Sequence, residues 1–310
     1  MNDFNTNWPN LHLDQWQDSY STLHLWTQIV GKIRLAQTPW INHSWHVPLY
    51  VSARGLTTSS IPDQSGTFQI DFDFCDHQLI IVSSDGKREE FALEPMSVAD
   101  FYQKTISSLE RLGFHVSIYP KPVEIPDPIK LFDEDAEMAA YDKEVVTRFW
   151  RILTQVNRVL GEFRSRFHGK VSPVHFFWGA FDLAVTRFSG RTAPKHPGGM
   201  PNCADWVMEE AYSHEVSSAG FWPGAGLGEP AFYAYAYPAP DGFKDYPVKP
   251  EAAYYHAELG EFILPYEAMR NAKDPDAALM DFLQTTYEAA AVLANWDREK
   301  LECDFSGLNR

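Results

Sequence analysis

The chain has 310 residues, of which 45% are hydrophobic and 22% are charged, and its formal net charge at pH 7 is −16. This length suggests one to three domains, and the composition is that of a globular protein rather than a disordered or fibrous one. The negative charge argues against general nucleic-acid binding and against docking on an anionic membrane. The sequence contains no run of about 18 apolar residues, so no membrane span is expected. Its first residues lack the basic and apolar regions of a secretory signal, so no such signal is expected there.

Three widely spaced cysteines, Cys75, Cys203 and Cys303, provide neither an even-numbered disulfide framework nor a C-x-x-C metal-binding pair. An odd count at such spacing favours a reducing compartment. We therefore predict a cytoplasmic protein whose thiols are structural or incidental.

The first part of the chain is predicted to form a helix, a group of strands and a second helix. Leu23, Trp26, Val30 and Ile33 recur at helical spacing, and the segments that follow alternate between apolar and polar residues, as half-buried strands do. The expected helices are 18–37 and 97–112, and the expected strands are 44–54, 67–74, 78–82, 89–93 and 114–119.

Four prolines between residues 120 and 128, with an acidic stretch soon after, mark the best candidate boundary, giving halves 1–127 and 128–310. In the second half, residues 171–188 are apolar at almost every position, which predicts a strand buried on both faces. The other expected elements there are helices at 141–168 and 276–296 and strands at 207–217, 231–237 and 261–264.

The predicted fold class is α+β, with antiparallel β-sheets covered by helices. Each half shows a helix, then strands, then a helix, which raises the hypothesis of an internal repeat; the alternative is that α+β proteins produce this order by chance. The two halves are expected to pack across a shared cleft, either as two similar units or as one integrated domain.

Familiar catalytic and nucleotide-binding motifs are missing from the sequence. No P-loop, H-E-x-x-H or G-x-S-x-G motif occurs. Gly224, Gly226 and Gly228 lead into Glu229-Pro230 rather than into a helix, so they lack the strand–turn–helix context of a dinucleotide fingerprint. A flexible loop is the better interpretation.

Several segments of both halves together form a distinctive set. They are TLHLW (22–26), QIVGKIRL (28–35), NH (42–43), SPVHFFWG (172–179), FDLA (181–184), TRFSGR (186–191), YSHE (212–215) and GFWPG (220–224). In these segments the chain resembles DUF5996, a bacterial family of unknown function, from Trp8 to Arg298. The resemblance implies a soluble bacterial protein with one architecture across both halves. It implies no catalytic residue and no cofactor.

Basic residues gather in an otherwise acidic chain, with nine lysines and arginines against two acidic residues between positions 145 and 195. Arg187 and Arg191 follow an apolar strand, where a cation needs a partner. Asp182 is one candidate partner, and a bound phosphate or carboxylate is the other, because a guanidinium binds such anions bidentately. Lys32, Arg34 and Arg54 form a second basic group. The helix arginines around Arg148 to Arg158 are expected on a solvated face.

Histidines supply candidate acid–base groups. If 44–54 is a strand, one of its faces carries His46, Tyr50, Ser52 and Arg54 and forms a site wall; the alternative is a solvated outer face without function. His175 lies in an apolar run, where a neutral core histidine and a ligand-binding residue are both open. The adjacent His214 and Glu215 face opposite ways on a predicted strand, so only one of them can line a pocket.

Tyr233, Tyr235 and Tyr237 alternate with Phe232 and two alanines, so a strand would present three phenols on one face. Such amphipathic rings suit contact with a ligand. The alternative is that they cover a helix layer and leave their hydroxyl groups at the rim.

Together these observations predict an enzyme that acts on a small anionic metabolite, and Arg187→Ala is expected to abolish stabilisation by that ligand. The alternatives are a non-catalytic binding or regulatory protein and a metal-dependent enzyme with His, Glu and Asp ligands. No cofactor, metal ligand, nucleic-acid partner or membrane partner is assigned. The predicted catalytic residues are His46, His214 and Glu215, and the predicted ligand-binding residues are Lys32, Arg34, Arg54, His175, Arg187, Arg191, Tyr233 and Tyr235.

Overall fold

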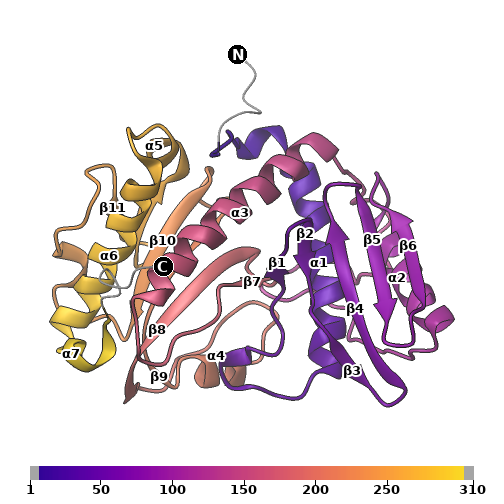
Figure 1. Ribbon diagram of the computed structural model, residues 1–310, viewed down its shortest axis with the longest axis horizontal. Coiled ribbons are helices and arrows are strands. Elements are labelled where there is room, and N and C mark those ends of the chain that lie inside the picture. The colour runs from indigo at the N-terminus through magenta and orange to yellow at the C-terminus, as the bar shows by residue number, and fades with distance from the viewer. Residues whose placement is uncertain (1–6, 304–310) are drawn as a thin grey trace.

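The computed structural model describes residues 7–303, which form two six-stranded antiparallel sheets with helices between and around them (Figure 1). The α+β class with antiparallel sheets is confirmed. Within the described residues, no helix is long and apolar enough to cross a lipid bilayer.

The first sheet has the strand order β1-β2-β4-β5-β6, with β3 paired to β4. Its strands bury alternate residues, as Phe68, Ile70 and Phe72 of β4 show. Helix α2 begins after Ser97, whose side chain accepts a hydrogen bond from the backbone N–H of Asp100. The elements of this half are α1 (Gln17–Gln37), β1 (Tyr50–Val51), β2 (Gly55–Thr57), β3 (Ile61–Asp63), β4 (Gly66–Asp73), β5 (Gln78–Ser83), β6 (Arg88–Ala92) and α2 (Val98–Leu112), with the 3₁₀ turns η2 (Leu13–Gln15) and η3 (Asn42–Ser44).

The second sheet has the order β11-β12-β10-β9-β8-β7. A long helix precedes it and another follows it, as in the first half. Its elements are α3 (Lys143–Ser165), β7 (His175–Phe177), β8 (Asp182–Thr192), α4 (Asp205–Ala211), β9 (His214–Trp222), β10 (Ala231–Tyr237), η4 (Phe243–Asp245), β11 (Tyr254–His256), β12 (Glu261–Pro265), α5 (Tyr266–Arg270), α6 (Pro275–Leu293) and α7 (Arg298–Leu301).

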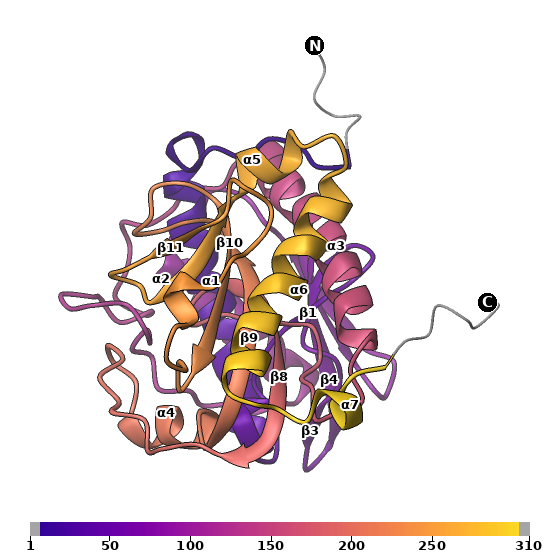
Figure 2. The same ribbon diagram turned by 90° about the vertical axis from the view of Figure 1, so that its left-hand side faces the viewer.

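The two faces of the second sheet have different surroundings. One face carries Leu183, Val185 and Arg187 of β8 and packs against α3 and α6; in Figure 2, α6 runs in front of the sheet and α3 lies beside it. Since successive side chains of a strand point to opposite faces, Asp182 and Ala184 belong to the other face. That face looks toward the first half of the chain.

Helix α1 joins the two halves, because it is buried around most of its circumference. Trp178 of the second half lies against Gly31 of α1, where an added Cβ would stand 2.1 Å from the indole nitrogen. The same nitrogen donates a hydrogen bond to the Val47 carbonyl at 2.9 Å. The backbones of Leu49 and Phe176 also pair, so a continuous apolar core runs through both sheets.

Most of the long periodic segments are confirmed as predicted, within a few residues at each end. The predicted strand 44–54 is wrong: His43 and Ser44 adopt positive φ values of 58° and 55°, and only Tyr50–Val51 pairs as a strand. His46, Tyr50, Ser52 and Arg54 therefore do not share one strand face.

Three other strand predictions are also wrong. Residues 171–188 contain a tight hairpin, with Phe181 at φ 59° between β7 and β8, instead of one strand. The segment 207–217 begins as helix α4, consistent with its Met, Glu and Ala residues, and becomes β9 only at His214. Residues 114–119 form no strand.

Candidate functional site

A cavity of about 600 Å³ lies against the inner face of the second sheet, and we call it the main cavity. Strands β7 to β10 and β12 form its floor, and η3, the linker around Glu124, and α4 with the loop before it form its walls and roof. Binding sites for small molecules commonly have volumes of about 300–1,000 Å³, so the cavity has the size of a ligand site.

Aromatic rings form much of the wall of the main cavity. They come from elements that are far apart in sequence and include exposed as well as buried side chains. These residues are Trp40, Trp45, Phe177, Trp178, Phe188, Trp206, Tyr212, Trp222, Tyr233 and Tyr235.

Three carboxylates line the main cavity: Asp182 of β8, Glu261 of β12 and Glu124 of the proline-rich linker. Burial raises the pKa of Asp182 to about 6. Burial, and secondarily the charge of Asp182, raises the pKa values of Glu124 and Glu261 to about 7. Among the described residues that line the cavity there is no lysine or arginine. The carboxylates therefore have no lysine or arginine beside them in the cavity wall.

Asp182 and Tyr233 form a buried pair on the floor. The Tyr233 hydroxyl donates a hydrogen bond to Oδ2 of Asp182, whereas Oδ1 is buried and accepts none from any described residue. Gly220 lies between them on β9, and a Cβ there would stand 2.6 Å from the Tyr233 oxygen. Glycine at this position is therefore needed for Tyr233 to reach across to Asp182.

A second set of hydroxyl groups lies one step further along the same sheet face. The Tyr235 and Tyr212 hydroxyls are 2.7 Å apart, and those of Thr186 and Ser218 are 2.8 Å apart. Paired hydroxyls satisfy one another and can also redirect a donor or an acceptor toward a ligand.

His175 lines the same floor and is almost completely buried. Burial lowers its pKa to about 3, so its ring is neutral at physiological pH. Its Nδ1 has no hydrogen-bond partner within residues 7–303. Two residues that line the main cavity, His175 and Asp182, thus each carry a buried polar atom that protein groups leave unsatisfied.

The roof helix α4 is attached to η3 through His43. The backbone N–H of His43 donates to both carboxylate oxygens of Glu210, at 2.9 and 2.8 Å, and its ring Nδ1 lies 3.0 Å from the Ala211 carbonyl. These contacts hold the end of α4 over the cavity.

A family model described as a family of unknown function (DUF5996) matches residues 8–303. The chain belongs to the DUF5996 family. No curated protein and no solved structure matches it. Every lining residue of the main cavity lies inside the matched range, so the cavity is formed entirely by the DUF5996 region.

In this DUF5996 chain, three of the residues predicted for the site line the main cavity: His175, Tyr233 and Tyr235. The hairpin between β7 and β8 places His175 and Asp182 on the same face, although an unbroken strand would have separated them. The tyrosine row lies on one face of β10, as predicted.

The predicted basic residues do not gather around the cavity. Arg187 projects from the other face of the sheet, donates to the Phe163 carbonyl and stacks over the Phe163 ring at 3.5 Å. Arg191 forms an ion pair with Glu215 at 2.6 Å. Their guanidinium groups are therefore bound by the protein itself.

The second basic group is bound internally as well. Lys32 donates to the carbonyls of Tyr119 and Lys121, at 3.1 and 2.5 Å, and Arg34 donates to the Pro48 carbonyl. Arg54 forms ion pairs with Asp73 and Asp76, both at 2.6 Å.

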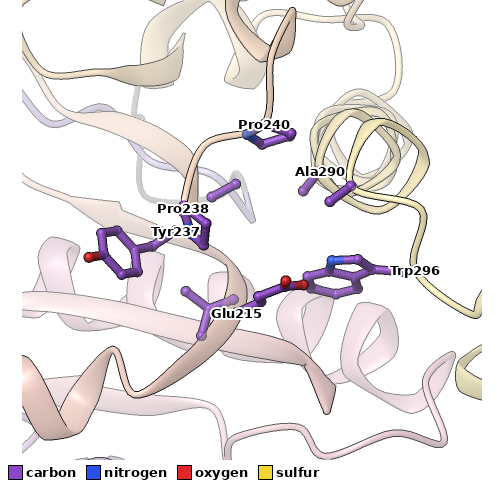
Figure 3. A pocket seen from close by; sticks show the side chains of 9 residues that line it. Glu215, Tyr237, Pro238, Pro240, Ala290 and Trp296 are labelled. Carbon is purple, nitrogen blue, oxygen red and sulfur yellow. The ribbon is translucent and has the colours of Figure 1, made fainter. Parts of the chain in front are cut away.

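The predicted acid–base residues do not line the main cavity either. His46 packs against Trp40, with ring centroids 4.6 Å apart, and His214 lies beside Ser213. Glu215 faces a separate pocket of about 70 Å³, where its carboxylate lies beside the Trp296 ring (Figure 3). That pocket is too small for a metabolite.

Across the described part of the chain, no three His, Cys, Asp or Glu side chains come together to hold a metal ion.

The sequence interpretation did not assign the three carboxylates to a ligand site. The sequence interpretation gives Asp182 as a candidate partner for Arg187 and Arg191, although an acid inside an apolar run is also a signal of a buried functional group. Glu261 shares a strand face with the tyrosine row. Glu124 adopts φ 59° in the proline-rich linker, and no spacing rule predicts its position.

Proposed function

We propose that the main cavity binds a small organic cation, a protonated amine with an apolar body. The observation that carries the proposal is the set of three carboxylates, Asp182 buried and Glu124 and Glu261 half-buried, in a wall to which no described lysine or arginine contributes. Burial of a carboxylate without a counter-charge is unfavourable, and a bound cation removes that cost.

The polar and aromatic groups of the cavity suit the same ligand. Asp182 lines the cavity, and its carboxylate would accept a charge-assisted hydrogen bond from an ammonium N–H. Faces of Trp, Tyr and Phe rings attract cations, with Trp the strongest. Such a site would hold the charged end of an amine between Asp182 and the surrounding rings.

An anionic metabolite, as predicted from the sequence, has less support from this geometry. A phosphate or carboxylate in the cavity would lie beside Asp182 and Glu261 without a lysine or arginine of the lining to hold it. The predicted anion-binding arginines Arg187 and Arg191 are bound to protein groups elsewhere.

Catalysis is a second candidate function for the same cavity, favoured by the Asp182 carboxyl. A pKa of about 6 suits a general base near neutral pH, and the Tyr233 hydroxyl bound to it would orient the carboxylate. Release of a chemically altered amine after incubation with the protein would support an enzyme, whereas recovery of the unchanged amine supports a binding protein.

The binding proposal is tested by calorimetric titration of the full chain with alkylamines and with alkyl carboxylates and phosphates of matched length. We expect amines alone to bind, and Asp182→Asn to weaken that binding by about 10- to 100-fold, the usual loss for a charge-assisted hydrogen bond. Asp281→Asn, at an exposed position of α6, is the matched control and should bind as the wild type does. Binding of the carboxylates or phosphates in preference to the amines would refute the proposal.

A further inference from the structure

We infer that the ligand is elongated, with its cationic end at Asp182 and an unbranched apolar chain that runs beneath α4 to the surface. This inference rests on the proposed function and adds the shape and polarity of the ligand to it. Three features of the main cavity carry it: the apolar face of α4, the rim, and the change in polarity with depth.

Helix α4 has no buried residue, although its sequence contains several apolar side chains. Val207, Met208 and Ala211 line the main cavity. A surface helix ordinarily turns its apolar stripe toward the protein core. In α4 this stripe faces a cavity instead, which leaves the space below it for an apolar ligand.

Exposed hydrophobic side chains gather at the rim of the same cavity. Trp206 is 55% exposed and Trp40 is 47% exposed, and their ring centroids lie 5.3 Å apart. Leu35 and Leu259 are also exposed and also line the cavity. Half of the large exposed hydrophobic residues in the described part of the chain therefore surround this one opening, and such clustering marks contact sites.

Polarity changes with depth in the main cavity. The buried side chains of Asp182, His175 and Tyr233 line its floor. Ala184 and Phe188, which are also buried, add apolar atoms to the lining on either side of the paired Thr186 and Ser218 hydroxyls, and the exposed rim ends in tryptophan and leucine. This gradient orients the ligand with its charge inside and its hydrocarbon toward the opening.

The inference predicts how affinity depends on chain length. Each methylene buried from water contributes enough free energy to raise affinity about fourfold. In titrations with butylamine, hexylamine and octylamine, we expect the dissociation constant to fall about fourfold per methylene, provided each amine stays below the concentration at which it self-associates. Octanoate serves as the ligand of equal length and opposite charge.

Trp206→Ala tests the rim directly, and its side chain is exposed enough for the variant to fold. We expect octylamine affinity to fall by about tenfold or more, while butylamine affinity stays within twofold of the wild type. Tyr254→Ala removes another exposed ring that does not line the cavity, so it should leave both affinities unchanged. Met208→Ser changes the side of α4 that faces the cavity. Like Trp206→Ala, it should lower octylamine affinity and leave butylamine affinity within twofold of the wild type.

The outcomes separate the two claims. If no amine binds the wild type, or if octanoate binds as well as octylamine, the proposed function fails. If butylamine and octylamine bind with equal affinity, or if Trp206→Ala and Met208→Ser leave the chain-length dependence intact, the cationic site stands and the inference about the chain is overturned.

Discussion

At the residue scale, Asp182 lowers the stability of the unliganded fold at neutral pH. Its pKa rises from 3.8 to about 6 on burial, so between these values the unfolded chain ionises while the folded chain does not. Folding therefore loses stability as pH rises through this window, up to about 3 kcal/mol above pH 6, because each pKa unit corresponds to about 1.4 kcal/mol. The unliganded fold loses this stability because no described protein group neutralises the charge of Asp182.

This cost predicts that Asp182→Asn stabilises the protein at pH 7.5 by up to about 3 kcal/mol and has little effect at pH 4. The asparagine keeps an oxygen that can accept the Tyr233 hydrogen bond. Urea unfolding at the two pH values measures the difference, with Asp281→Asn expected to show none. A variant less stable than the wild type at pH 7.5 would show that the ionised carboxylate stabilises the unliganded fold.

The same pKa values predict how amine binding depends on pH. A protonated amine binds the ionised form of Asp182, whose pKa is about 6 without ligand. Affinity should therefore rise about tenfold from pH 5 to pH 7, and binding near pH 6 should release protons. Calorimetry in two buffers of different ionisation enthalpy measures this release, and an affinity that does not vary with pH would exclude a titrating carboxyl at the binding site.

At the element scale, successive side chains of β8 point to opposite faces of the sheet, and the two faces have different roles. Asp182 and Ala184 face the cavity, and Arg187 faces α3 and α6, where its guanidinium lies 4.4 Å from the centre of the Tyr287 ring and 5.0 Å from that of Phe167. Burial lowers the pKa of Arg187 to about 10. It remains charged at neutral pH and is held by aromatic faces and a carbonyl rather than by a ligand.

Arg187→Ala is therefore expected to lower the free energy of unfolding by about 3 kcal/mol or more, since it leaves a cavity among packed rings and removes the guanidinium from the Phe163 carbonyl, which keeps its hydrogen bond from the Arg166 backbone N–H. The shift in melting temperature caused by an amine should remain, in contrast to the outcome predicted from the sequence. Thermal melts with and without octylamine measure both effects. Arg187→Lys should not restore stability, because an ammonium does not stack as a guanidinium does.

The sequence predicts structural features well when they depend on residues that are close together in the chain. The alternating residues of β4 and the tyrosine row of β10 depend on strand periodicity alone, and both are confirmed. Helix α1 is different, because its polar residues His24 and Gln28 are buried. Their side chains form hydrogen bonds with backbone groups of Gly179 and Val123, which lie about 100 or more residues away in the sequence. Such distant contacts, like the position of Glu124 beside the cavity, leave no periodic signal in the sequence.

At the scale of the whole molecule, the main cavity exists only where the two halves meet. His43, Val47 and Glu124 come from residues 1–127, whereas Asp182 and Tyr233 come from residues 128–310. The apolar core is also continuous between the halves. The boundary predicted at the proline-rich linker therefore runs through the cavity wall rather than between two separate sites.

We predict that the full chain unfolds in one cooperative transition and that residues 128–310 alone neither unfold cooperatively nor bind octylamine. Without the first half, Trp178 loses Gly31 and the Val47 carbonyl, and Phe176 loses its backbone pairing with Leu49, so a large apolar face of the second half meets water. Calorimetric and van't Hoff enthalpies that agree for the full chain would support one cooperative unit. Gly31→Ala offers a milder test: the added methyl collides with the Trp178 ring, and overpacking of this kind should lower the free energy of unfolding by about 1–3 kcal/mol. Two separate transitions, with the second retained in the isolated half, would instead assign independent folding to each sheet.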